Sequence, residues 1–231
     1  MIREIIPRMS QMMIANFGTE IIYSFMIIAC SLMIYFGTKK LYETSSYKGI
    51  KYFRQTFLFF ALAYFSRTFI KLIALYFDSD DLMRIAPSLM NPLVAYVSML
   101  LFLYFSTTAI FYLMYSIVWK KVNHSNYVIP LIHLISFLLA FIILFFGNLN
   151  LYIFVNIILF AAVLYAIYFS TTFSKKSKFY TVYILLALFW ILNILDILIP
   201  GFLVSSQILV YLASLSIFLL IAYKVLRTAG N

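Results

Sequence analysis

The stretch YVIPLIHLISFLLAFIILFF, which spans Tyr127–Phe146, contains no Asp, Glu, Lys or Arg. An α-helix rises about 1.5 Å per residue, so a run of about 20 residues matches the hydrocarbon core of a bilayer, about 30 Å thick. Gly147 and Asn148 follow directly, and such residues are typical of the polar turns between membrane helices. The stretch therefore predicts a transmembrane helix.

The rest of the chain repeats this pattern of long apolar runs and short polar connections. Six further runs of about 20 residues or more have the same character: Ile14–Gly37, Gln55–Phe77, Leu89–Trp119, Leu149–Phe173, Phe179–Ile199 and Phe202–Leu226. Of the 231 residues, 65% are hydrophobic and only 10% are charged, whereas about 25% of residues are charged in soluble domains. We therefore predict an all-α integral membrane protein with a seven-transmembrane-helix bundle over residues 14–226. A short N-terminal interfacial segment (residues 1–13) would precede the bundle, and a short cytoplasmic tail (residues 227–231) would follow it.

Lysine and arginine gather on one side of the predicted bundle. Alternate connections and the C-terminus carry the following cations with one acid, Glu43, among them: Lys39, Lys40, Lys48, Lys51, Arg54, Lys120, Lys121, Lys175, Lys176, Lys178, Lys224 and Arg227. The opposite side has three cations and four acids: Arg3, Arg8, Arg84, Glu4, Asp78, Asp80 and Asp81. By the positive-inside rule the C-terminus is cytoplasmic and the N-terminus lies outside a cell membrane that the chain crosses several times. The net charge of +10 therefore reflects topology and does not indicate nucleic-acid binding.

Four ionisable side chains fall inside the predicted spans: Glu20, Arg67, Lys71 and Asp196. Their charges sum to zero, and an isolated charge at the bilayer centre costs at least a few kcal/mol. We therefore expect the four side chains to face one another across the interior of the bundle. Arg67 lies about 15 Å below the outer end of its span, so its side chain reaches water less easily than that of Lys71.

Other polar and aromatic side chains are predicted at a similar height in the outer half. Two groups have helical spacing, Tyr64, Arg67 and Lys71 on one span and Trp190, Asn193 and Asp196 on another. The pattern predicts an outward-facing ligand-binding pocket lined by Glu20, Tyr64, Arg67, Lys71, Asn91, Asn156, Trp190, Asn193 and Asp196. The alternative is that the charges form interhelical ion pairs, that the asparagines hydrogen-bond between helices, and that Trp190 packs in the core.

Several classes of chemistry find no support in the sequence. Cys30 is the one cysteine, so an intrachain disulfide is impossible, and the motifs of common hydrolases and phosphate-binding loops are missing. His133 has no second metal-ligating residue at helical spacing, so we interpret it as a core histidine bonded to a neighbour rather than as a metal ligand. Lys224, the one lysine of the last span, lies at its cytoplasmic end, which excludes a mid-membrane Schiff base. We expect no enzyme, metal or cofactor.

Three functions agree with these features. The first is a seven-helix sensor or receptor that binds a small polar or anionic ligand from outside and signals to a separate protein partner. The second is a small secondary transporter that uses the same charged cluster. The third is a structural subunit of a larger membrane complex. All three place the chain in contact with the lipid bilayer, and the predicted apolar inner half favours the first over the second.

Overall fold

The fold is known from a computed structural model, which describes residues 17–78, 87–119, 127–147, 149–173, 180–198 and 204–230. The elements in these ranges are α-helices: α2 (Phe17–Gly37), α3 (Lys39–Ser45), α4 (Lys48–Asp78), α5 (Pro87–Val118), α6 (Val128–Phe146), α7 (Leu149–Phe173), α8 (Tyr180–Leu198) and α9 (Val204–Gly230). The predicted interfacial segment 1–13 lies outside the described residues. The all-helical prediction is confirmed for the part of the chain that is described.

The long helices follow the apolar runs in the sequence. Four stretches in the described ranges are long and apolar enough to cross a membrane: Ile21–Ser45, Tyr96–Val118, Val128–Phe146 and Leu209–Thr228. Asn150–Tyr165 within α7 and Tyr180–Leu192 within α8 are shorter apolar stretches. These stretches indicate a multi-pass membrane protein.

The predicted polar connection from Thr38 to Arg54 is mostly helical. It contains α3 and the first two turns of α4, which begins at Lys48 instead of Gln55. The lysines and Glu43 favour helix as readily as a loop, because long unbranched side chains lose little rotamer freedom in a helix. With 31 residues α4 is about 46 Å long, so it extends beyond a hydrocarbon core of about 30 Å.

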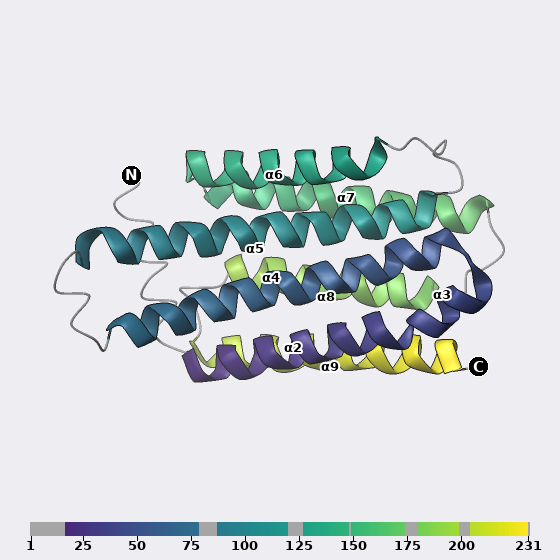
Figure 1. The fold of residues 1–231 in the computed structure, drawn as a ribbon, viewed down its shortest axis with the longest axis horizontal. Helices are drawn as coiled ribbons and strands as arrows, with labels where there is room; N and C mark the ends of the chain where they lie inside the picture. The colour runs from purple at the N-terminus through teal and green to yellow at the C-terminus, as the bar shows by residue number, and fades with distance from the viewer. Residues whose placement is uncertain are drawn as a thin grey trace.

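The long helices run up and down along one axis of the molecule (Figure 1). Helix α2 contacts α4 and α9, and the chain of contacts continues from α4 to α5, α7, α8 and back to α9. These six helices therefore form a closed ring, which we call the six-helix ring. Helix α6 packs against α5 on the outside of this ring.

The six-helix ring encloses one core made from stripes of buried residues at three- and four-residue spacing. The stripe on α4 consists of Phe53, Phe57, Phe60 and Tyr64. The stripe on α2 consists of Tyr23, Ile27, Cys30 and Ile34, and that on α9 of Tyr211, Ser214, Phe218, Ile221 and Val225. This spacing is typical of helices that pack along their whole length.

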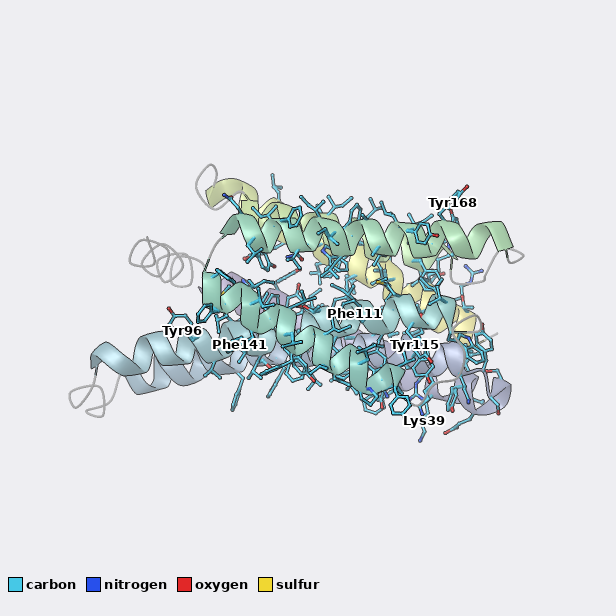
Figure 2. The ribbon with its side chains drawn as sticks, turned by 90° about the horizontal axis from the view of Figure 1, so that it is seen from above. Lys39, Tyr96, Phe111, Tyr115, Phe141 and Tyr168 are labelled. Carbon is cyan, nitrogen blue, oxygen red and sulfur yellow. The ribbon has the colours of Figure 1, made fainter. Side chains whose placement is uncertain are left out.

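Helix α6 has one buried and one exposed face, as expected of a helix at the edge of a membrane bundle. The face toward α5 and α7 contains Ile132, Ser136, Ala140 and Ile143, all buried. Small residues such as Ser136 and Ala140 allow close helix approach, as is common between membrane helices. The other face exposes a row of stacked phenylalanines, Phe137, Phe141 and Phe145, of which Figure 2 labels Phe141. An apolar face of this kind is suited to contact with lipid.

Gly49 of α4 and Gly18 of α2 provide a matched pair for testing the packing around the start of α4. A Cβ atom on Gly49 would lie 2.5 Å from Tyr47 Cε1, 2.6 Å from Trp119 Nε1 and 2.9 Å from Trp119 Cδ1, whereas a Cβ atom on Gly18 would meet nothing within 4 Å. We predict that Gly49→Ala lowers the free energy of unfolding by about 1–3 kcal/mol, because the rigid indole must move. Gly18→Ala should leave it unchanged or raise it by up to about 1 kcal/mol, since alanine favours helix. Denaturation of the purified protein in detergent micelles measures both. Equal effects of the two substitutions would contradict the packing at Gly49.

Candidate functional site

Arg67 lies on the core-facing stripe of α4. Counting from the buried Phe53, the stripe continues through Phe57, Phe60 and Tyr64 at alternating steps of about four and three residues and reaches Arg67 at the next step. The Arg67 side chain is half-buried, and its guanidinium carbon lies 5.4 Å from the centre of the Phe102 ring on α5. This cation–π contact is among the interactions that stabilise a positive charge away from water.

Three tyrosines from three helices lie together in the core next to this arginine. Tyr23 on α2 stacks on Tyr211 of α9 with ring centres 4.7 Å apart and meets Tyr64 of α4 edge-on at 5.8 Å. The hydroxyl oxygens of Tyr23 and Tyr64 are 3.4 Å apart. We call Tyr23, Tyr64 and Tyr211 the tyrosine cluster. Its member on α4, Tyr64, precedes Arg67 by one helical turn, and each tyrosine hydroxyl can donate or accept a hydrogen bond.

The core stripes become polar in sequence on the Arg67 side of the tyrosine cluster. On α8 the buried residues Val182, Leu186 and Phe189 lead at the same spacing to Asn193 and Asp196. One turn before Tyr23 the α2 stripe reaches Glu20, and one turn before Tyr211 the α9 stripe reaches Gln207. The stripes of these helices therefore change from apolar to polar residue types in the same direction along the bundle. Gln207 was not among the predicted site residues.

The structure describes the helix positions of all nine predicted site residues but the side chains of only some. The side chains of Glu20, Lys71, Asn91, Asn193 and Asp196 lie outside the described residues, and the predicted pairing of the four intramembrane charges stays a prediction. Tyr64 and Arg67 are brought together with Phe102. Trp190 is buried in the main core, and Asn156 donates a hydrogen bond from Nδ2 to the Tyr152 carbonyl oxygen of its own helix at 2.9 Å.

Phenylalanine rings fill the core on the side of the tyrosine cluster that is away from Arg67. Phe57, Phe60, Phe189 and Phe218 are buried, and their ring centres are 6.2 Å apart for Phe57–Phe218, 6.3 Å for Phe60–Phe189 and 4.9 Å for Phe189–Phe218. We call these four residues the phenylalanine plug. It joins α4, α8 and α9 and presents no polar atom other than backbone, so it opposes the passage of an ion or polar solute.

A second polar cluster lies between α5 and α6, outside the six-helix ring. The Tyr104 hydroxyl is 2.8 Å from His133 Nδ1, and the Tyr112 hydroxyl is 3.2 Å from Nε2. A neutral imidazole donates from one nitrogen and accepts at the other, so the two tyrosines have opposite roles. The Phe59 ring of α4 covers the imidazole, with ring centres 5.5 Å apart. The interpretation of His133 as a core histidine bonded to its neighbours is confirmed.

Among the described ranges, no group of three or more His, Cys, Asp or Glu side chains is placed to hold a metal ion. Comparison of the chain with protein-family models, with curated proteins and with solved structures gives no match.

The His133 cluster predicts a measurable contribution to the docking of α6. Replacing His133 with Phe leaves the Tyr104 and Tyr112 hydroxyls without this partner in an apolar setting, and should cost about 1–2 kcal/mol of unfolding free energy. Leu134→Ala, on the exposed face of the same helix, should cost less. The coupling is obtained by combining His133→Phe with Tyr112→Phe in a double-mutant cycle. Strictly additive costs would show that the two side chains do not interact.

Proposed function

We propose that the chain is a seven-helix membrane sensor or receptor that binds a small anionic or polar ligand in an outward-facing pocket and signals through a separate protein partner. The single observation that carries the proposal is the position of Arg67, on the core-facing stripe of α4 and next to the tyrosine cluster. Burial of arginine in a membrane bundle is costly, and such residues usually mark ligand or ion sites.

The chemistry of this site fits an anion such as a carboxylate or a phosphate. The guanidinium of Arg67 presents a planar fork of N–H donors that matches two oxygen atoms of such a group. Tyr23 and Tyr64 offer hydroxyl groups for a further hydrogen bond, and the stacked rings of Tyr23 and Tyr211 form an apolar floor. The other intramembrane charges, Glu20, Lys71 and Asp196, would complete the pocket.

The mechanism that follows is a shift between two packings of the bundle. The tyrosine cluster joins α2, α4 and α9, so a ligand that draws Arg67 toward itself changes the contacts of all three helices. A ligand shifts such an equilibrium only by its differential affinity for the two packings, and a 100-fold difference corresponds to about 2.7 kcal/mol. The partner would recognise the packing that the ligand favours.

The transporter alternative requires a second opening toward the cytoplasm. The phenylalanine plug fills the core on that side of the tyrosine cluster, with Phe57 and Phe218 fully buried. Transport would need these rings to separate in every cycle. A sensor needs only the outer pocket, so the plug favours the sensor. The subunit alternative would appear as a stable complex during purification.

The sensor proposal is tested by ligand-induced thermal stabilisation of the purified protein. A set of small carboxylates, inorganic phosphate and inorganic sulfate serves as the probe. At least one of these anions should raise the unfolding temperature, and Arg67→Met should weaken that binding by about 10- to 100-fold, the usual contribution of a charged hydrogen bond. Lys51→Met removes an exposed cation from the same helix and should leave binding unchanged.

Two outcomes would contradict this site. Unchanged folding and unchanged stabilisation in Arg67→Met would show that the arginine does not bind ligand. Loss of folding that is restored by Glu20→Gln would show that Arg67 belongs to a structural ion pair. Uptake of the stabilising anion by vesicles containing the protein would favour the transporter.

The proposed orientation is tested by adding one cysteine at a time, either near the start of α2 or near the end of α3. Gly18 and Thr44 are both exposed, whereas the native Cys30 is buried and should not react with a membrane-impermeant maleimide. In intact cells we expect Gly18→Cys to be labelled and Thr44→Cys to be labelled only after the membrane is opened. The reverse pattern would invert the orientation, and labelling of both residues from one side would exclude a first span between them.

A further inference from the structure

The corner where α2 turns into α3 lies against the last turn of α9. Gly37 ends α2, and a side chain at this position would collide with Leu226 of α9. Helix α3 contacts α2, α4 and α9. The first residues of α3, Lys39 and Lys40, are thereby brought beside the helix turn that carries Arg227.

Two exposed cations, Lys39 and Lys40, stand at the start of α3, and two more, Lys224 and Arg227, stand near the C-terminal end of α9. We call them the basic corner. All four are exposed, so each can reach a ligand at the end of the bundle. Figure 2 shows Lys39 toward the opposite end of the long axis from Tyr96, and toward the same end as Tyr115 and Tyr168.

The charge of the basic corner is only partly compensated. Lys39 Nζ lies 3.7 Å from Glu43 Oε1 one helical turn away, with more than half of each side chain exposed. An exposed pair of this kind contributes little binding energy and leaves Glu43 able to repel an approaching anion. Arg227 donates to the Tyr223 hydroxyl at 3.4 Å, and this neutral group does not offset its charge.

The surroundings of the corner are those of a membrane interface. Tyr35 lies half-buried near the end of α2. Arg54 of α4 donates a hydrogen bond from Nε to the Tyr35 carbonyl oxygen at 3.0 Å, and its guanidinium carbon lies 4.7 Å from the centre of the Tyr35 ring. Tyr47 and Trp119 pack edge to face close to the same connection. Tyrosine, tryptophan, lysine and arginine are enriched at the level of lipid headgroups. Helix α3 also turns Leu41 and Tyr42 inward and Lys40 and Thr44 outward, as interfacial helices do.

We propose that the basic corner binds the headgroup of an anionic phospholipid, with Lys40 and Arg227 in contact with its phosphate, Lys224 adding positive charge at the same end of α9, and Lys39 restrained by Glu43. The proposal does not depend on the ligand pocket at Arg67. The site lies at the membrane surface and takes a lipid that remains in the bilayer. It accounts for the basic side chains that α9 and α3 bring together from distant parts of the sequence.

The test uses the full chain in neutral detergent, titrated with short-chain phosphatidylglycerol, with short-chain phosphatidylcholine and with glycerol 3-phosphate. Native mass spectrometry counts the bound lipids and gives their affinity. We expect phosphatidylglycerol to bind more tightly than phosphatidylcholine. Each basic residue near an anionic lipid contributes about a fivefold change, so the triple replacement Lys40→Gln, Lys224→Gln and Arg227→Gln should weaken phosphatidylglycerol about 100-fold.

Two further variants separate the corner from general charge and from loss of folding. Replacing Lys175, Lys176 and Lys178 with Gln removes the same number of charges elsewhere on the predicted cytoplasmic side and should change the affinity less than tenfold. Glu43→Gln removes the repelling carboxylate and should tighten binding of phosphatidylglycerol. This gain cannot come from misfolding.

The proposal is overturned if phosphatidylcholine binds as tightly as phosphatidylglycerol. It is also overturned if the Lys175, Lys176 and Lys178 variant loses as much affinity as the corner variant, or if Glu43→Gln weakens binding. Equal binding of glycerol 3-phosphate would identify a soluble anion, and not a lipid, as the occupant.

Discussion

The packing of aromatic rings along α4 is the interaction on which the rest of this structure depends. In lipid no hydrophobic effect drives one helix toward another, so close packing and interhelical polar contacts must hold a bundle together. Phe53 meets Tyr183 of α8, Phe57 meets Phe218 of α9, and Tyr64 meets Tyr23 of α2. These contacts join α4 to α2, α8 and α9. They also fix which face of α4 points into the six-helix ring.

That constraint also decides where Arg67 lies. Once Phe57, Phe60 and Tyr64 are buried, the helical repeat carries residue 67 toward the same side, where a charge needs compensation. About 19 Å of helix separate Arg67 from Arg54, whose guanidinium lies at the other end of the stripe against Tyr35. The two arginines of α4 thus occupy different environments, Arg54 against Tyr35 of α2 and Arg67 against Phe102 of α5.

Much of the fold could be predicted from the sequence, because apolar runs such as Tyr127–Phe146 are long and uninterrupted. The helix of residues Val128–Phe146 differs from that run by one residue. The helix α3 and the early start of α4 were not predicted, since Lys39, Glu43 and Lys48 give no hydrophobic period to recognise. The order of the helices around the six-helix ring could not be predicted either. It depends on which helix faces pack together, and the lengths of the apolar runs do not show this.

The candidate site could be predicted in part for related reasons. Arg67 stood out because a charge is rare in an apolar span. Tyr23 and Tyr211 did not, since the chain has 19 tyrosines and nothing in their local sequence distinguishes them. The core spacing that ends at Tyr211 could have indicated Gln207, one turn away, had the stripe on α9 been extended. Tyr104 and Tyr112 lie on one helix eight residues apart, so their convergence on His133 depends on tertiary packing.

The two ends of the bundle are linked by the same two helices. Helix α2 carries Tyr23 in the tyrosine cluster and ends at Gly37, and α9 carries Tyr211 in that cluster and Leu226 against Gly37. A helix transmits displacement along its axis because its backbone hydrogen bonds hold the rise per residue constant. A displacement of α2 along α9 at the tyrosine cluster would therefore also reach the contact of Gly37 with Leu226. Leu226 meets Gly37 with the far end of a flexible side chain, so this contact can follow a small shift between the two helices without breaking.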